Sequence, residues 1–213
     1  MSKYVFVGDV HGKSEAVKLA LDKSGHKVFV GDFCDSFDRT IAEHEDCLTL
    51  VLDAIDKGEA SAIYGNHELS YLMPTVHRCS GYSTSMESML VPHVKRIKDS
   101  FKPFIELGED WLVTHAGLHP GVALALPETW EAEFNNPKSP MHWVGGSRGG
   151  PNPVGGMFWC DFNDEFKPLE GLNQIFGHSR HMTHDIRTRK GKNSINYCID
   201  CLDSQIKFLE LEI

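Results

Sequence analysis

The sequence has no apolar stretch long enough to cross a membrane, since none of its hydrophobic runs approaches the ~20 residues that a spanning helix needs. It also lacks the apolar core of a secretion signal, because the opening run MSKYVFVGDVHG reaches acidic residues and glycine too early. We therefore expect no membrane partner. The expected location is the cytoplasm, or the host cytoplasm if the chain is viral.

Positive charge is in short supply. The 21 lysines and arginines are outnumbered by 30 aspartates and glutamates, which gives a formal net charge of −9. A nucleic-acid backbone is bound through clustered cations, so this balance disfavours nucleic acid as a partner. The 213 residues, 41% of them hydrophobic, can bury a sizeable core. We expect a single domain over residues 1–213, and the sequence does not define its oligomeric state.

Cysteine is scarce and poorly spaced for a zinc site. Of the six cysteines, only Cys198 and Cys201 form a C-x₂-C pair, and no second pair completes a set of four ligands. The run SINYCIDCL around them is typical of a β-strand. We therefore expect reduced thiols, several of them in the core.

Strand and helix patterns alternate in the first half of the chain. Apolar runs at 4–7, 28–30 and 60–64 indicate buried strands, each followed by glycine and then a polar residue. Helical spacing of apolar residues separates these runs, first behind an expected cap at Ser14 and then over 48–55. This order predicts right-handed crossovers and a sheet with a parallel part.

The second half is less regular. Runs at 104–107 and 111–114 flank a Gly-Glu-Asp turn and predict a hairpin. Residues 135–156 are rich in proline and glycine and predict a long ordered loop, a common form of lid or binding loop. Further strands are expected at 174–176, 195–199 and 205–211.

Five apolar runs end in polar residues of the kinds that bind metal ions or catalyse reactions. The five clusters are GDVHG (8–12), GDFCD (31–35), GNHE (65–68), HAG (115–117) and GH (177–178). Ligands gather beyond the carboxyl ends of strands in α/β sheets, so these clusters should converge. Each cluster alone is typical of a turn, but their succession indicates one metal site. Mixed oxygen and nitrogen ligands suit Mn²⁺, Fe or Zn²⁺ better than Ca²⁺.

This ordered set resembles the motifs of the calcineurin-like metallophosphoesterase superfamily. GNHE together with HAGLHP resembles most its phosphoprotein phosphatase branch, which includes bacterial and phage Ser/Thr phosphatases and diadenosine tetraphosphate hydrolases. The resemblance extends from Val5 to about Asp200 and is specific for fold and chemistry rather than for substrate. It implies an α/β sandwich of two mixed β-sheets flanked by helices, with a dinuclear metal site at the carboxyl ends of strands.

The resemblance also implies ligands for two divalent metal ions, with Mn²⁺ expected first and Fe, Zn²⁺ or Ni²⁺ as alternatives. One bridging carboxylate can hold two ions ~3.5–4 Å apart, a separation that suits in-line phosphoryl displacement. The implied ligands are Asp9 and His11 for the first ion, Asp32 between the two, and Asn66, His115 and His178 for the second. In GHSRH, His181 stands one position too far along for a further ligand of the superfamily's GHxH kind.

Two more residues match catalytic positions. His67 corresponds to a general acid that protonates the leaving-group oxygen, and Asp35 to the carboxylate that orients that imidazole. Glu68 is expected to be structural, because a carboxylate suits the positive end of the short helix that should follow.

The residues that grip the phosphate are less well defined. The phosphoprotein phosphatases place an arginine directly after the second aspartate of GDxxD, where this chain has Ser36. Arg39, three residues later, could reach the site on a longer loop or could be an ordinary surface residue. Arg148, within GGSRGG, is the best further candidate because glycines permit close approach to an oxyanion, and Arg180 is the third.

We expect an enzyme that hydrolyses phosphomonoesters, with protein phosphoserine and phosphothreonine as one substrate class, by in-line attack of a metal-bridging hydroxide. The alternative is a nucleotide hydrolase acting on a dinucleoside tetraphosphate or a 2′,3′-cyclic phosphate. Residues 73–92 and 135–156, treated as loops, should decide between them, and Tyr82, Trp143 or Trp159 could stack a base. A metal-binding regulatory protein without activity is disfavoured, because it would not need His67 and Asp35.

Overall fold

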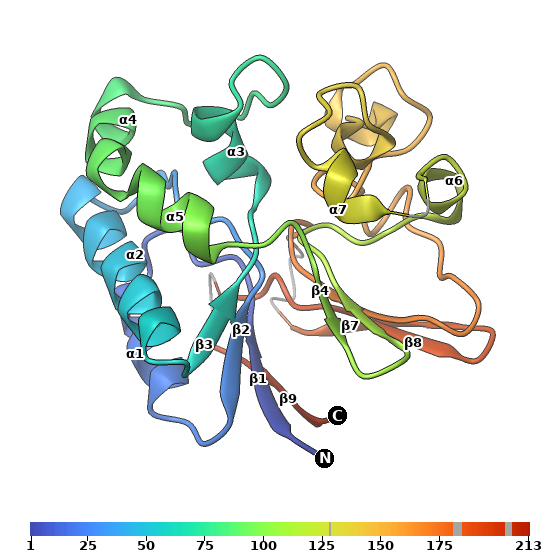
Figure 1. The fold of residues 1–213 in the computed structure, drawn as a ribbon, viewed down its shortest axis with the longest axis horizontal. Coiled ribbons are helices and arrows are strands. Elements are labelled where there is room, and N and C mark those ends of the chain that lie inside the picture. Colours follow the sequence, from blue (N-terminus) through green and yellow to red (C-terminus); the bar gives the residue numbers. More distant parts are fainter. Residues whose placement is uncertain (128, 181–184, 203–205) are drawn as a thin grey trace.

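A computed structural model describes residues 1–127, 129–180, 185–202 and 206–213, and it contains two mixed β-sheets (Figure 1). The first sheet has the strand order β3-β2-β1-β9, in which β1, β2 and β3 are parallel and β9 runs antiparallel to β1. Its strands are β1 (Lys3–Val7), β2 (His26–Phe29), β3 (Ala60–Ala62) and β9 (Leu209–Glu212).

The second sheet has the strand order β4-β5-β6-β8-β7. Its central strands β5, β6 and β8 are parallel, while β4 and β7 are antiparallel edge strands. The strands are β4 (Ile105–Leu107), β5 (Trp111–Val113), β6 (Asn173–Phe176), β7 (Arg187–Gly191) and β8 (Ser194–Cys198). The expected hairpin is confirmed as β4 and β5, and the expected pair of mixed sheets is also confirmed.

Helices cover the outer face of the first sheet, where α1, α2, α4 and α5 lie together (Figure 1). They are α1 (Ser14–Leu21), α2 (Ile41–Asp56), α4 (Thr84–Leu90) and α5 (Val94–Ser100). The start of α2 is defined by a capping box, in which the Thr40 hydroxyl accepts from the Glu43 amide and the Glu43 carboxylate accepts from the Thr40 amide.

Short helices and turns occupy the connections. The helix α3 (Asn66–Leu72) follows β3 directly, whereas α6 (Pro120–Ala123) and α7 (Trp130–Glu133) lie above the second sheet (Figure 1). Three 3₁₀ turns are η1 (Val91–His93), η2 (Pro140–His142) and η3 (Gly146–Arg148). Apart from η2 and η3, residues 135–156 are irregular, as expected for a long loop.

The core explains why β1 is apolar at consecutive positions. Phe6 belongs to a cluster between the two sheets, with Val113 and Ile175 of the second sheet, whereas the adjacent Val7 belongs to the larger cluster beneath the helices. Successive side chains of a strand point to opposite faces, so a strand that is buried on both faces must be apolar throughout. A third cluster, which includes Phe166, lies against the second sheet. The sheets therefore form the sandwich that the resemblance implied.

Three local expectations need correction. Ser14 is the first residue of α1 rather than its cap; Lys13 holds the cap position, with no side-chain hydrogen bond. Residues 73–92 are not one loop, because they contain α4 and the start of η1. The strand β7 was missing from the expected strands.

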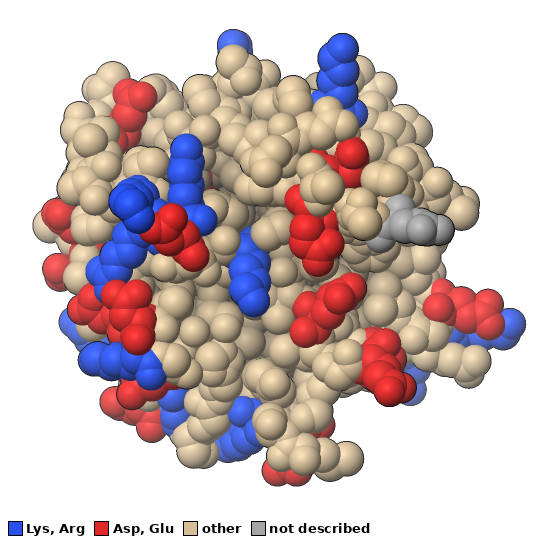
Figure 2. Space-filling view, viewed as in Figure 1, with Lys and Arg blue, Asp and Glu red and all other residues tan. Residues whose placement is uncertain are grey.

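Three further features concern the cysteines, the length of the helices and the surface charges. All six cysteines are free thiols, and five of them are buried. In the part of the chain that the structure describes, no helix is both long enough and apolar enough to span a membrane. Figure 2 shows acidic and basic side chains interspersed on the face in view, rather than one large patch of either sign.

Candidate active site

The five polar clusters converge at one edge of the sandwich. They follow β1, β2, β3, β5 and β6, which are parallel within their sheets and so end at a common edge. A cavity of about 620 Å³ opens there. Five of the six expected metal ligands line it, namely Asp9, His11, Asp32, Asn66 and His178. The sixth, His115, is fully buried and contacts Asn66 and His178.

The backbone is unusual at this edge. Among the described residues other than glycine, five have a positive φ, and four of them are expected site residues: His11 (44°), Asp32 (54°), Asp35 (59°) and His178 (65°). The left-handed conformation costs roughly 1–2 kcal/mol for a residue with a Cβ atom. Strain of this kind persists where the surroundings hold it and concentrates at functional sites.

Asp32 belongs to both of two groups of potential metal ligands. One group joins it with His11 and His67 and the other with His115 and His178, and the ligand atoms within each group lie within 4.8 Å of one another. Asp32 Oδ2 is 3.7 Å from His11 Nε2 and 3.4 Å from His115 Nε2. The Asp32 carboxylate is therefore common to both groups of potential ligands.

The second group directs its ligand atoms toward a common point. His115 Nδ1 lies 2.8 Å from the Val30 carbonyl and donates to it, so Nε2 is the ring atom that a metal ion would bind once the ring is neutral. Asn66 Oδ1 is 2.7 Å from that Nε2 and 2.9 Å from His178 Nδ1, while the Asn66 amide nitrogen donates to Cys79 Sγ. Facing acceptors repel one another unless a proton or a metal cation lies between them. This donor set fits a divalent metal ion.

The first group is oriented in the same way. His11 Nδ1 lies 2.9 Å from the Cys34 carbonyl and 2.7 Å from the Asp35 carbonyl, so its Nε2 faces the cavity as an acceptor. The carboxylate oxygens of Asp9 accept from the His178 amide at 3.1 and 2.9 Å. Backbone groups thus fix both side chains before any ion binds.

Two glycines allow this crowding. A Cβ atom at Gly65 would lie 2.1 Å from Asp32 Oδ1, and one at Gly177 would lie 1.8 Å from Asp9 Oδ1. Any other residue at either position would therefore displace a carboxylate of the site. This close approach explains why glycine stands before Asn66 and before His178 in the sequence.

Burial and the charge of Asp32 shift several pKa values in the site. Burial lowers the pKa of His115, but the negative charge of Asp32 outweighs burial and raises that pKa to about 9. Burial raises the pKa of Asp32, but His115, His67 and His11 reverse the effect and hold it well below the usual value. For Asp9 burial dominates, and with the charge of Asp200 it raises the pKa well above the usual value. Bound cations would supply the positive charge that these carboxylates need.

His67 and Asp35 are brought together as expected. His67 Nδ1 lies 2.8 Å from Asp35 Oδ2, and the hydroxyl of Tyr71 donates to Asp35 Oδ1 at 2.5 Å. Burial lowers the pKa of His67, but the charges of Asp32 and Asp35 outweigh it and raise the pKa to about 9. Without bound metal ions the ring therefore keeps its proton at neutral pH, and Nε2 is the nitrogen that can donate it. Tyr71 was not found from the sequence, because nothing in its spacing links it to Asp35.

Two of the three expected phosphate-binding arginines line the cavity, namely Arg148 and Arg180. The Arg148 guanidinium donates to the His178 carbonyl at 3.2 Å and the Ser179 hydroxyl at 3.3 Å, and it pairs with Asp161 at 2.8 Å. Arg148 is thus anchored beside a metal-ligand position.

The structure removes Arg39 from the phosphate-binding candidates. It is absent from the cavity lining, and its guanidinium pairs with Glu15 of α1 at 2.8 Å and Glu43 of α2 at 3.3 Å. Two carboxylates on neighbouring helices hold the side chain on the surface, so the surface-residue reading of Arg39 was the correct one. His181 lies outside the described residues.

Two contributions were not visible in the sequence. Arg78, on the segment between α3 and α4, is exposed at the cavity, and no motif marks it. Glu68 is structural, as expected, but it does more than complement a helix dipole. Its buried carboxylate accepts from four backbone amides, those of Asp32 (2.9 Å), Phe33 (2.6 Å), Cys34 (2.9 Å) and Gly65 (2.9 Å).

The sequence matches the family model of calcineurin-like phosphoesterases over residues 2–184. The chain therefore belongs to the calcineurin-like phosphoesterase family and is a phosphoric ester hydrolase of a family that depends on divalent metal ions. No curated protein gives a significant match to the sequence.

Two solved structures support the fold, and a third is less similar. A protein serine/threonine phosphatase from Saccharomyces cerevisiae is 17% identical with a TM-score of 0.52, over 92% of this chain and 67% of the other. A cold-active protein tyrosine phosphatase is 18% identical with a TM-score of 0.62, over 100% of this chain and 74% of the other. A putative diadenosine tetraphosphatase is 18% identical over 99% of this chain and 93% of the other, with a TM-score of 0.47.

Proposed function

We propose that residues 1–213 form one catalytic domain that hydrolyses phosphomonoesters, including phosphoserine and phosphothreonine in proteins. The observation that carries this proposal is the His67–Asp35 pair beside Asp32. A serine or threonine alkoxide is a poor leaving group and must be protonated as its bond to phosphorus breaks. A charged imidazolium at the wall of the cavity meets this requirement.

The residues present fit two divalent ions, and we propose Mn²⁺ as the native metal. Asp9 and His11 would hold the first ion and Asp32 would be shared. Asn66, His115 and His178 would hold the second ion. When bound, such a pair of ions supplies a deprotonated water near neutral pH and positive charge for the phosphate oxygens.

The protein itself contributes orientation and a proton. Arg148 and Arg180, which both line the cavity, would position the phosphate by charge-assisted hydrogen bonds. His67 Nε2 would give its proton to the leaving oxygen, while Asp35 stabilises the charged ring before transfer and Tyr71 holds Asp35 in place. The phosphorylated substrate is the partner that this arrangement requires.

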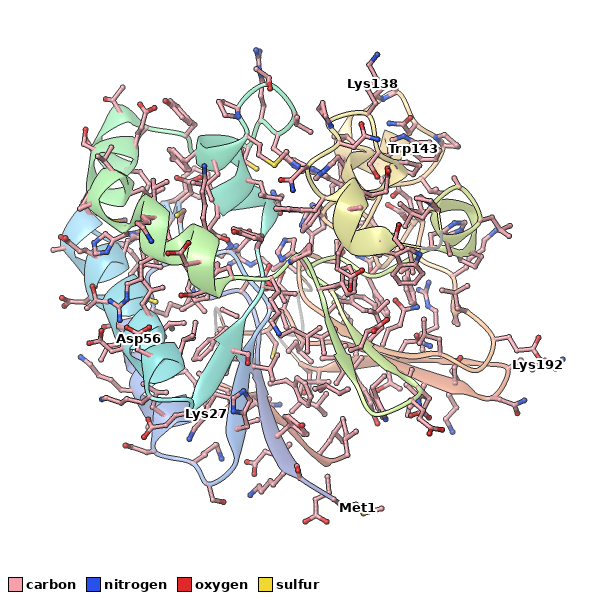
Figure 3. All side chains as sticks on the ribbon, viewed as in Figure 1. Met1, Lys27, Asp56, Lys138, Trp143 and Lys192 are labelled. Atoms are coloured by element: carbon pink, nitrogen blue, oxygen red, sulfur yellow. The ribbon has the colours of Figure 1, made fainter. Side chains whose placement is uncertain are left out.

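A nucleotide hydrolase is the second candidate because of Phe37. This side chain is 96% exposed at the cavity rim and offers an open surface for a base. The three aromatic residues expected from the sequence offer less. Tyr82 already stacks on Tyr71. Trp159 is 7% exposed, and Trp143 is not part of the lining and lies on the irregular segment above the second sheet (Figure 3).

A substrate panel with Mn²⁺-loaded protein tests the proposal. The members are p-nitrophenyl phosphate, its bis-ester, a phosphoserine peptide, a dinucleoside tetraphosphate and a 2′,3′-cyclic nucleotide. We expect the phosphopeptide and p-nitrophenyl phosphate to be hydrolysed fastest, with turnover lost after chelation and restored by Mn²⁺. The variant Asp32→Asn should retain neither metal nor turnover. Faster hydrolysis of the bis-ester or the dinucleotide would replace this proposal, and no turnover of any member would refute it.

A further inference from the structure

The cavity is rich in carboxylates, so a phosphate dianion needs several cations to enter it. Five aspartates line it: Asp9, Asp32, Asp35, Asp38 and Asp200. Its lysine and arginine side chains are Lys13, Arg78, Arg148 and Arg180. Arg148 shares its charge with Asp161, and Lys13 and Arg180 also have partners within the protein.

Arg78 differs from the other three cations. It makes no hydrogen bond or ion pair with any residue in the described part of the chain, and it is exposed to the cavity. An arginine has five donors in a planar fork, which matches two oxygens of a phosphate. Its donors are therefore available to a ligand without breaking a contact to any described residue.

The backbone on both sides of Arg78 is nevertheless fixed. The preceding His77 is fully buried, with Nδ1 accepting from Trp159 Nε1 at 2.8 Å and Nε2 2.9 Å from His142 Nδ1. The following Cys79 contacts Asn66 twice, through the Asn66 amide nitrogen at 2.8 Å and its carbonyl at 3.1 Å. Arg78 thus lies between a buried anchor and a metal-ligand position.

The same segment also covers the proton donor. A Cβ atom at Gly81 would lie 3.1 Å from the Cβ of Asp35, so this part of the backbone packs against the partner of His67. Two residues later, the Ser83 amide donates to the Tyr71 hydroxyl at 3.1 Å, and Tyr71 in turn binds Asp35. Residues 77–83 are therefore held by contacts along their length, and residues 78–81 line the cavity together with Asn66 and His67.

We propose that Arg78 binds the phosphoryl group of the substrate and of the phosphate product, gripping two of its oxygens. This inference rests on the proposed phosphatase function and names a residue of its binding site. Arg78 supplies the cation that Arg39 does not, because Arg39 is held by Glu15 and Glu43 away from the cavity.

Binding of inorganic phosphate to the Mn²⁺-loaded protein tests this role independently of turnover. Isothermal titration calorimetry should show phosphate affinity reduced about 10-fold to 100-fold in Arg78→Ala, the loss expected for a two-bond charged contact. Arg78→Lys should recover only part of it, because an ammonium cannot make the paired contact. Product inhibition by phosphate should weaken by the same factors. Arg39→Ala is the matched control and should change phosphate affinity less than about twofold.

Metal content and thermal unfolding of each variant complete the test. Both should match the wild type in Arg78→Ala and in Arg78→Gln, a second variant that keeps the length of the side chain. Unchanged phosphate affinity in these variants would overturn the inference, as would an equal loss in Arg39→Ala or a loss of metal that points to the Cys79–Asn66 contact instead. If wild-type protein binds phosphate through Arg78 but hydrolyses no phosphoester, the proposed function fails and the binding site stands.

Discussion

At the scale of single residues, two histidines of the site have different chemistry because of what faces each ring. Asp32 and Asp35 raise the pKa of His67 to about 9 against the effect of burial. Burial, with the positive charges of His115 and Arg148 nearby, holds the pKa of His178 well below its usual value. His67 therefore carries a proton that it can give to a leaving group, whereas His178 has a free electron pair for a metal ion. The surroundings of the two rings, rather than the residue type, therefore determine which one can act as an acid and which one can bind a metal ion.

The assignment of His67 predicts a loss that depends on the leaving group. In His67→Gln, kcat for a phosphoserine peptide should fall about 10²- to 10⁴-fold, because the leaving alkoxide loses its proton donor. The fall should be much smaller for p-nitrophenyl phosphate, whose leaving group needs little protonation. Steady-state kinetics on both substrates measure the difference, and His93→Gln, on η1 beside Glu45, is the control. An equal fall on both substrates would contradict leaving-group protonation by His67.

Single residues also show where sequence reasoning succeeds and fails. The convergence of the six candidate ligands could be predicted because each stands at a fixed distance behind an apolar run, and parallel strands bring such positions together. Arg39 and Arg78 could not be placed, because their environments depend on contacts between distant segments. Glu15, 24 positions before Arg39, holds its side chain on the surface. The orientation of Arg78 depends on the anchors of its neighbours His77 and Cys79.

At the scale of elements, the connection between β2 and α2 is organised around Glu68 of α3. This connection contains Asp32 and Asp35, and its backbone would otherwise leave several amides unsatisfied in a buried place. One carboxylate satisfies them together with the Gly65 amide. The loop that holds Asp32 and Asp35 therefore depends on a helix that follows the next strand.

Replacing one of the two carboxylate oxygens of Glu68 should lower the stability of the protein measurably. Glu68→Gln replaces one carboxylate oxygen by a donor that faces backbone N–H groups, so the free energy of unfolding should fall by roughly 1–3 kcal/mol per amide left without a partner. Urea denaturation of the metal-free protein measures this. Glu106→Gln, an exposed glutamate on β4, should change stability by less than about 0.5 kcal/mol. A change at Glu68 no larger than at Glu106 would show that the four contacts do not hold the loop.

The elements differ in how readily the sequence reveals them. The strands β1 and β2 are apolar runs bounded by glycine, and α2 has clear helical spacing, so all three were predictable. The helix α4 was not, because its short apolar set lies between Gly81 and Pro92, two residues typical of loops. Its formation depends on burying Met86 and Leu90 against the large core, which is a tertiary effect.

At the scale of the whole molecule, a buried chain of hydrogen bonds joins the segment after α3 to the irregular segment above the second sheet. Trp159 Nε1 donates to His77 Nδ1, so His77 Nε2 carries the proton and donates to His142 Nδ1. His142 Nε2 then donates to the Phe134 carbonyl at 2.9 Å. Every ring nitrogen has a partner only if both histidines are neutral. This series of hydrogen bonds therefore links the two sides of the cavity through the uncharged rings of His77 and His142.

This arrangement predicts that the protein becomes less stable as the pH falls. Burial, with His142 and His115 nearby, lowers the pKa of His77 to about 3, whereas an unfolded histidine has a pKa of about 6.5. Below pH 6.5 the unfolded chain takes up a proton that the folded protein does not. Stability is therefore fully present above about pH 6.5 and is lost progressively down to about pH 3. Between pH 7 and pH 5 the loss attributable to His77 should be about 2 kcal/mol.

Urea denaturation of wild type and His77→Gln at both pH values isolates this contribution. Glutamine does not titrate, so the fall in stability between pH 7 and pH 5 should be about 2 kcal/mol smaller in the variant, whatever its stability at pH 7. Trp159→Phe removes one hydrogen bond of the chain but no titrating group, so its stability curve should lie below that of the wild type with the same slope. Equal slopes for wild type and His77→Gln would mean that His77 takes up its proton within the folded protein, and the two sides of the cavity would then not be joined through a neutral ring.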